Sequence, residues 1–196
     1  MKYLILPLTL LALSLPSCNS TPSWLDEMNG CLAEREVKLL NISLKRFEEV
    51  LNKKSEGETL TDKYIHFLKD VERLNLLPEY YHDLLIKETI KTMLNTDFYE
   101  QMWQQSTQWV LNDGKGTPVY IINGFGNIPT CLAESANHAW FTQKMNTFKK
   151  PVNPVPSFLA KELLNQLKPE DYELPQIRAF IALSLCYQLG VAYYDK

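Results

Sequence analysis

The spacing of apolar residues along the chain predicts helices almost throughout. From Ser23 onward, apolar side chains recur at intervals of three and four residues, with charged or amide side chains between them. This is the pattern of helices that bury one face. Ser, Thr and Pro at several predicted starts are typical of helix caps and first turns. The predicted helices cover residues 23–54, 62–76, 78–94, 96–110, 130–148, 157–167 and 175–194.

The final predicted helix, over residues 175–194, is apolar on most of its sides. Within 179–194 only Ser184, Gln188 and Gly190 interrupt the apolar run. That run is shorter than the roughly 20 apolar residues of a membrane span. We therefore expect a buried central helix that the other helices surround. The sequence predicts an all-α fold, a single-domain multi-helix bundle of about seven helices.

Residues 112–129 interrupt the helical pattern. This span holds four of the seven glycines of the chain, and they flank the β-prone run Val119-Tyr120-Ile121-Ile122. Eighteen residues are many for a connection without structure of its own. We interpret the span as a joint between two parts of the fold, with a working loop as the alternative.

Two pairs of similar segments favour an internal duplication. The tetrapeptide Cys-Leu-Ala-Glu occurs at 31–34 and again at 131–134, and several positions of 67–94 recur in the same order in 158–185. Each half would then contain a long helix, a shorter helix, a Pro-Glu corner and an apolar helix. The two halves expected on this basis are 24–112 and 128–196.

The chain begins with a predicted export signal. Lys2 is followed by a mostly apolar run over 4–15, which is too short to span a bilayer and is typical of a signal peptide. The segment Leu15-Pro16-Ser17-Cys18 resembles the lipobox of bacterial lipoproteins, with its aliphatic residue, small residue and invariant Cys. The alternative is ordinary cleavage near Ser20, which leaves a soluble exported protein.

The lipobox resemblance implies a location and a membrane partner. Residues 1–17 would be the signal peptide, Cys18 the lipidated N-terminus, 18–23 a short tether and 24–196 the folded domain. Several acyl chains on one residue make anchoring effectively permanent. Because no Asp follows Cys18 directly, the resemblance implies a bacterial cell-envelope protein at the outer membrane that faces the periplasm.

Three cysteines remain after Cys18, in a compartment that favours disulfide bonds. Cys186 lies in the most apolar predicted helix, where we expect a buried thiol. The other two, Cys31 and Cys131, are the expected disulfide pair. Three buried free thiols are the alternative.

The predicted helix over 96–110 has two distinct faces. Aromatic and aliphatic residues form one stripe, which we expect in the core. Gln101, Gln104, Gln105 and Gln108 follow the spacing i, i+3, i+4 and i+7, which places them together on the opposite face of a helix. We interpret this uncharged face as a candidate binding surface for protein or glycan, or as an ordinary polar surface.

Composition excludes several functions. Lys and Arg number 20 and Asp and Glu number 23, for a net charge of −3, so no positive excess is available for a phosphate backbone and no nucleic-acid partner is expected. His66, His82 and His138 fall in no zinc-binding spacing, so no metal is expected. The glycines form no phosphate-binding motif, and we expect no cofactor.

One carboxylate offers an enzymatic alternative. Glu134-Ser135 resembles the Glu-Ser pair of lysozyme-like lytic transglycosylases, in which a lone Glu acts as acid and base. The Gly-Leu-Met-Gln type of segment that follows this pair in the family is absent here. Such a Glu also needs an apolar pocket that holds its proton at neutral pH. Glu134 and His138 are four residues apart in the predicted helix, so they can meet across one turn.

The leading prediction is a non-enzymatic binding role in the envelope, because a large helical surface is present and a catalytic constellation is not. One version is an immunity protein that blocks a toxin in the periplasm, which makes another protein the expected partner. The alternative is a peptidoglycan-acting enzyme, similar to a lytic transglycosylase, that uses Glu134.

Overall fold

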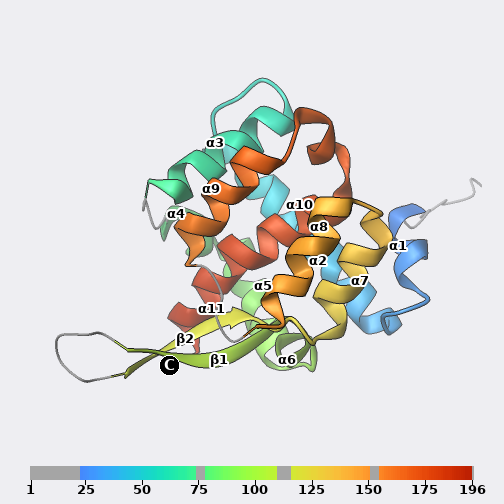
Figure 1. The fold of residues 1–196 in the computed structure, drawn as a ribbon. Helices are drawn as coiled ribbons and strands as arrows, with labels where there is room; N and C mark the ends of the chain where they lie inside the picture. The colour runs from blue at the N-terminus through green and yellow to red at the C-terminus, as the bar shows by residue number, and fades with distance from the viewer. Residues whose placement is uncertain (1–22, 74–77, 110–115, 151–154, 196) are drawn as a thin grey trace, which may run out of the picture.

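The computed structural model describes residues 23–73, 78–109, 116–150 and 155–195 (Figure 1). The predicted signal peptide, Cys18 and most of the tether lie outside these residues.

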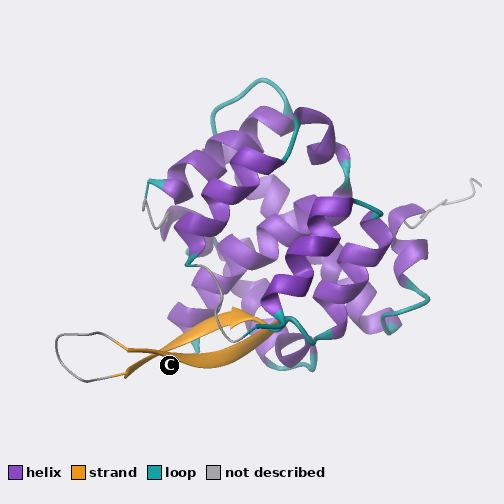
Figure 2. Ribbon diagram, in the orientation of Figure 1, coloured by secondary structure: helices purple, strands orange, loops and turns teal. Residues whose placement is uncertain are grey.

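The described chain is one domain, mostly helical, with a single small sheet (Figure 2). This confirms the predicted all-α class. The sheet consists of β1 (Trp103–Trp109) and β2 (Gly116–Ile122). The α-helices are α1 (Ser23–Met28), α2 (Glu34–Lys54), α3 (Leu60–Glu72), α4 (Pro78–Tyr81), α5 (Leu84–Leu94), α6 (Phe98–Met102), α7 (Asn127–Ala136), α8 (Ala139–Phe148), α9 (Pro156–Gln166), α10 (Pro175–Ile181) and α11 (Gln188–Tyr194). A 3-10 helix, η1 (Pro169–Glu173), and a π-helical segment, η2 (Ala182–Tyr187), complete the helical elements of these residues.

The first predicted helix, over 23–54, is divided into α1 and α2 by a turn that contains Gly30 and Cys31. The backbone N–H of Ala33 donates to Oε2 of Glu36 at 2.8 Å, which satisfies one donor at the start of α2. The apolar periodicity continues across the turn, so periodicity alone could not locate the break.

The central helix of the bundle is continuous from α10 through η2 to α11. It covers Pro175–Tyr194, which is 20 residues, and its length and composition would suffice for a membrane span. The expectation that this apolar segment is too short for a membrane span was therefore wrong. Burial is the observation that favours a core helix over a membrane span, because 72% of the apolar window is buried inside the protein. The hydroxyl of Tyr187 donates to the carbonyl of Ser43 at 2.9 Å, so the central helix is also hydrogen-bonded to α2.

The predicted helix over 96–110 is wrong for most of its length. Helix α6 ends at Met102, and the following residues form β1, which pairs antiparallel with β2 from Trp103↔Ile122 to Trp109↔Gly116. Strand β1 has the β-prone Trp at both ends and one Thr, and its partner contains the four consecutive β-prone residues 119–122. Cross-strand pairing therefore overrides a helical spacing of polar residues. Part of the span predicted as a joint is strand β2.

The order of elements is compatible with the predicted duplication. In the first half, α2 is followed by α3, α4 and α5. In the second half, the pair α7–α8 is followed by α9, η1 and α10 in the corresponding order. Helix α3 packs along α9. The two copies of the repeated tetrapeptide differ, because 31–34 lies mostly in a turn and 131–134 lies inside α7. A common origin of the halves stays a prediction.

Candidate functional site

The two-stranded hairpin projects from the helical body, and the C-terminal end of the chain lies beside it (Figure 1). Its base joins α6 at one strand and the loop before α7 at the other. Strand β2 also contacts α11, the last part of the central helix. The hairpin is therefore the part of the described molecule that extends furthest beyond the core while its base stays fixed.

Buried aromatic residues hold the base of the hairpin. Trp103 is 1% exposed and lies near Tyr99, with ring centroids 6.4 Å apart. Tyr99 also contacts the ring of Tyr120, with centroids 5.9 Å apart. The hydroxyl of Tyr120 donates to the carboxylate of Asp195. Burial first, and then this hydrogen bond, raises the pKa of Tyr120, so the hydroxyl remains a donor at physiological pH.

The outer edge of β2 is occupied by α11. The side-chain amide of Gln188 donates to the backbone carbonyl of Tyr120 at 2.8 Å from outside the ladder. In an antiparallel ladder, the N–H and C=O groups of a residue and of its partner either all point toward the other strand or all point outward. The two arrangements alternate along each strand. Tyr120 pairs with Gln105, and Pro118 pairs with Thr107. Pro118 therefore occupies an outward position, where its missing N–H costs no ladder bond.

The outer edge of β1 follows from the same alternation. The backbone N–H and C=O groups of Gln105 and Thr107 point away from β2. In the described part of the chain β1 pairs with β2 alone. Neither strand contains a charged residue. Natural edge strands are commonly protected by charges, by Pro or by a covering element, and the outer edge of β1 shows none of these among the described residues.

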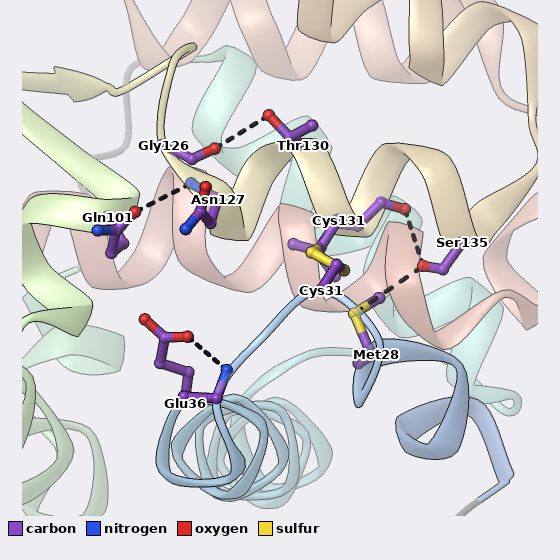
Figure 3. The surroundings of a disulfide bond; sticks show 11 residues. Met28, Cys31, Glu36, Gln101, Gly126, Asn127, Thr130, Cys131 and Ser135 are labelled. Carbon is purple, nitrogen blue, oxygen red and sulfur yellow. Dashed lines mark hydrogen bonds between the residues drawn. A yellow bond between two sulfur atoms is a disulfide. The ribbon is translucent and has the colours of Figure 1, made fainter.

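The predicted glutamine face does not exist. Gln101 lies on α6, and its Oε1 accepts a hydrogen bond from the backbone N–H of Asn127 at 3.0 Å (Figure 3). Gln104 and Gln105 are both exposed, but as neighbours on a strand they point to opposite faces of the hairpin. Gln108 is also a strand residue, and its side chain lies outside the described part. Side chains from 103 onward alternate with the period of two of a strand, instead of the period of 3.6 of the predicted helix.

Glu134 and His138 do not meet across a helical turn. Helix α7 ends at Ala136, and Asn137 has the left-handed conformation with φ of 47°. His138 caps α8 instead: its Nδ1 accepts from the backbone N–H of Phe141 at 3.3 Å.

The other ring nitrogen of His138, Nε2, lies 3.2 Å from Oδ1 of Asp171. Both nitrogens of His138 therefore have structural partners. Glu134 is exposed on α7, so its described surroundings do not provide the apolar pocket that a proton-holding acid requires.

The cysteines pair as the sequence favours. Cys31, in the turn before α2, is bonded to Cys131, in α7 (Figure 3). Their Cα atoms lie 6.1 Å apart and their sequence separation is 100. Cys186 is a free buried cysteine in the central helix, and burial raises the pKa of its thiol. The disulfide therefore fixes the N-terminal helix α1 and its following turn to the core.

An aromatic cluster beside the C-terminus was not found from the sequence. The His82 ring contacts Tyr81 and Tyr193, with centroids 4.7 and 4.6 Å away, and Tyr193 also contacts Tyr194. The Nζ atom of Lys87 lies 5.3 Å from the Tyr194 ring centroid. The Tyr-His and Tyr-Tyr dipeptides are visible in the sequence, but only the packing of α4 and α5 against the central helix brings them together.

No group of three or more His, Cys, Asp or Glu side chains within the described ranges could hold a metal ion. Comparisons with protein-family models, with curated proteins and with solved structures find no match to this chain.

Proposed function

We propose that this protein is a lipid-anchored bacterial envelope protein that binds another protein without catalysing a reaction. The observation that carries the proposal is the uncharged outer edge of β1, whose backbone groups at Gln105 and Thr107 point outward. An extended segment of a partner can add to such an edge as a third strand. The main-chain hydrogen bonds supply affinity in this mode, and the alternate side chains supply specificity.

The fixed base of the hairpin supports this proposal. Binding costs less when the recognition element is ordered before the partner arrives. The contacts of Trp103, Tyr120 and Gln188 hold β1 and β2 on the core in the free protein. A projecting strand edge is therefore available without a folding step.

The lipobox resemblance of residues 15–18 supports the anchored location. Acylation at Cys18 would hold the domain at the periplasmic face of the outer membrane, where it would meet proteins that enter or are exported. An immunity protein that captures a toxin is one version of this role. Labelling with a palmitate analogue tests the anchor: Cys18→Ala should lose the label and leave the membrane fraction.

The binding proposal is tested by changing one outward N–H. Gln105→Pro removes a donor from the outer edge of β1 and should keep the ladder, because Pro118 already occupies the paired strand in the same outward orientation. We expect affinity capture from envelope extracts to lose its specific partner with this variant.

Gln104→Ala is the matched control, because it alters an exposed side chain of β1 and keeps every backbone donor. It should retain the partner, and both variants should keep the far-UV circular dichroism of the wild type. Equal capture by folded Gln105→Pro and wild type would contradict the proposal.

A further inference from the structure

The loop between β2 and α7 presents an exposed phenylalanine. Phe125 is 73% exposed, which is the highest value among the large hydrophobic residues described as exposed. A single exposed apolar residue is ordinary on a protein surface. What distinguishes Phe125 is the hydrogen-bonded loop that carries it and the two lysines that follow the end of α8 on which this loop packs.

Hydrogen bonds fix the loop on both sides of Phe125. The side chain of Asn123 donates to the carbonyl of Glu100 at 2.8 Å and accepts from the N–H of Phe125 at 3.2 Å. The N–H of Gly126 donates to the carbonyl of Asn123 at 2.9 Å. The N–H of Asn127 donates to Gln101, as described above. The backbone of the loop is therefore ordered without any contribution from the Phe125 ring.

Two glycines let this loop lie directly on neighbouring backbone. A Cβ atom at Gly126 would lie 1.8 Å from the carbonyl oxygen of Gln101. A Cβ atom at Gly124 would lie 2.3 Å from the carbonyl carbon of Phe148 and 2.5 Å from the nitrogen of Lys149. The loop is thus pressed between the end of α6 and the end of α8.

This contact places the backbone of Lys149 against Gly124, the residue before Phe125. Lys149 and Lys150, which follow α8, are both exposed. Glu100 is the exposed acidic residue whose backbone holds Asn123. An apolar side chain with nearby lysines is the composition of protein surfaces that lie on anionic lipid.

The tether can bring this loop to the bilayer. Helix α7 begins at Asn127 and has 10 residues, which corresponds to about 15 Å. Helix α1 packs on α7, and the disulfide at Cys131 joins the turn after α1 to the same helix. A fully extended chain from Cys18 to Ser23 would span at most about 18 Å. The proposed lipid and Phe125 are therefore connected through two short helices that pack on each other, α1 and α7.

We infer that the Phe125 loop is a membrane-docking element. Phe125 enters the interface of the bilayer, while Lys149 and Lys150 contact anionic headgroups. This inference rests on the proposed lipid anchor, because one ring and two lysines bind weakly unless the protein is already held at the surface. Docking would fix the orientation of the domain, so that the hairpin takes a defined direction relative to the membrane.

A fluorescent probe beside the loop tests the inference. Asn127→Cys carries an environment-sensitive fluorophore next to an intact Phe125, and Asn165→Cys on α9 is the matched exposed control. The acylated full-length protein is reconstituted in vesicles of phosphatidylethanolamine and phosphatidylglycerol that contain a spin-labelled quenching lipid. We expect quenching at 127 that exceeds quenching at 165.

Substitutions separate docking from mere proximity. Phe125→Ser should lower the docked population by about tenfold. Replacing Lys149 and Lys150 by Gln should lower it by roughly fivefold per lysine on anionic vesicles and leave it unchanged on vesicles without phosphatidylglycerol. Equal quenching at both probe positions, or quenching at 127 that persists in Phe125→Ser, would overturn the inference.

The anchor is tested apart from the loop. If palmitate labelling shows no acylation at Cys18, an N-terminal hexahistidine tag on a nickel-chelating lipid replaces the tether and the same probes are used. Quenching at 127 under those conditions supports the docking loop although the proposed anchor has failed. A labelled Cys18 without quenching at 127 refutes the loop and leaves the anchor intact.

Discussion

Removal of the disulfide should cause a large loss of stability in this fold. The variant is Cys31→Ser with Cys131→Ala, since Cys31 is exposed and Cys131 is buried. The bond joins residues 100 positions apart. The chain-entropy relation for a loop of that size gives about 4.7 kcal/mol at 25 °C. Domains of this kind have total unfolding free energies of about 5–15 kcal/mol, so the predicted loss is a large share of the total.

Urea denaturation of the variant and the oxidised wild type measures this loss. With a slope of about 2 kcal/mol per molar urea, the midpoint should fall by roughly 2 M. Wild type reduced with dithiothreitol should unfold at the midpoint of the variant. Cys186→Ala is the control, because it removes a buried thiol outside the bridge and should lower stability by only about 1 kcal/mol. A midpoint within about 0.5 M of the oxidised wild type would refute the entropy argument.

Three further predictions concern single residues. Gly126→Ala should lower the unfolding free energy by about 2–4 kcal/mol, because its Cβ would overlap the carbonyl of Gln101. Gly30→Ala is the control, because no atom lies within 4 Å of its new Cβ, and it should change the unfolding free energy by less than about 0.5 kcal/mol in the same urea titration. Burial raises the pKa of Glu48, so the folded protein binds a proton at this carboxylate more readily than the unfolded chain does. The stability that this group contributes is therefore present at acidic pH and is lost as pH rises through the folded pKa. Glu48→Gln should flatten that part of the curve of unfolding free energy against pH. Glu134→Gln and wild type should both release no fragments from purified peptidoglycan, and release by the wild type alone would revive the enzymatic alternative.

Much of the helical fold could be predicted because its signals are local. Thr59 shows this at the start of α3, where its hydroxyl accepts from the N–H of Asp62 at 3.1 Å and its own N–H donates to Asp62 at 3.0 Å. The predicted helix begins at 62, two residues after the observed start at Leu60, because the hydroxyl of Thr61 could equally cap a helix that starts at 62. Boundaries depend on such small local differences.

The hairpin could not be predicted because its stability comes from a partner strand. Residues 103–109 carry a polar spacing that fits a helix as well as a strand. Their conformation is decided by pairing with 116–122 and by the packing of Trp103 and Tyr120 on the core. The interpretation of 112–129 as a joint therefore missed β2, the second strand of this hairpin.

The candidate site depends on contacts between segments that are distant in the sequence. The outward direction of the β1 edge follows from Gln188, which is 68 positions from Tyr120. The partner of His138 is Asp171, not the nearby Glu134. Sequence spacing indicates which residues share a helix face, but it does not indicate which element covers a strand edge.

Hydrogen exchange at β1 in the presence of the captured partner tests the central claim most directly. The amides of Gln105 and Thr107 point outward in the free protein and should exchange quickly, while Gln104, Ser106 and Gln108 donate inward to the ladder. We predict that the partner slows exchange at Gln105 and Thr107 by at least about tenfold and leaves the inward amides little changed. Unchanged exchange at both outward amides in a saturated complex would contradict strand addition at this edge.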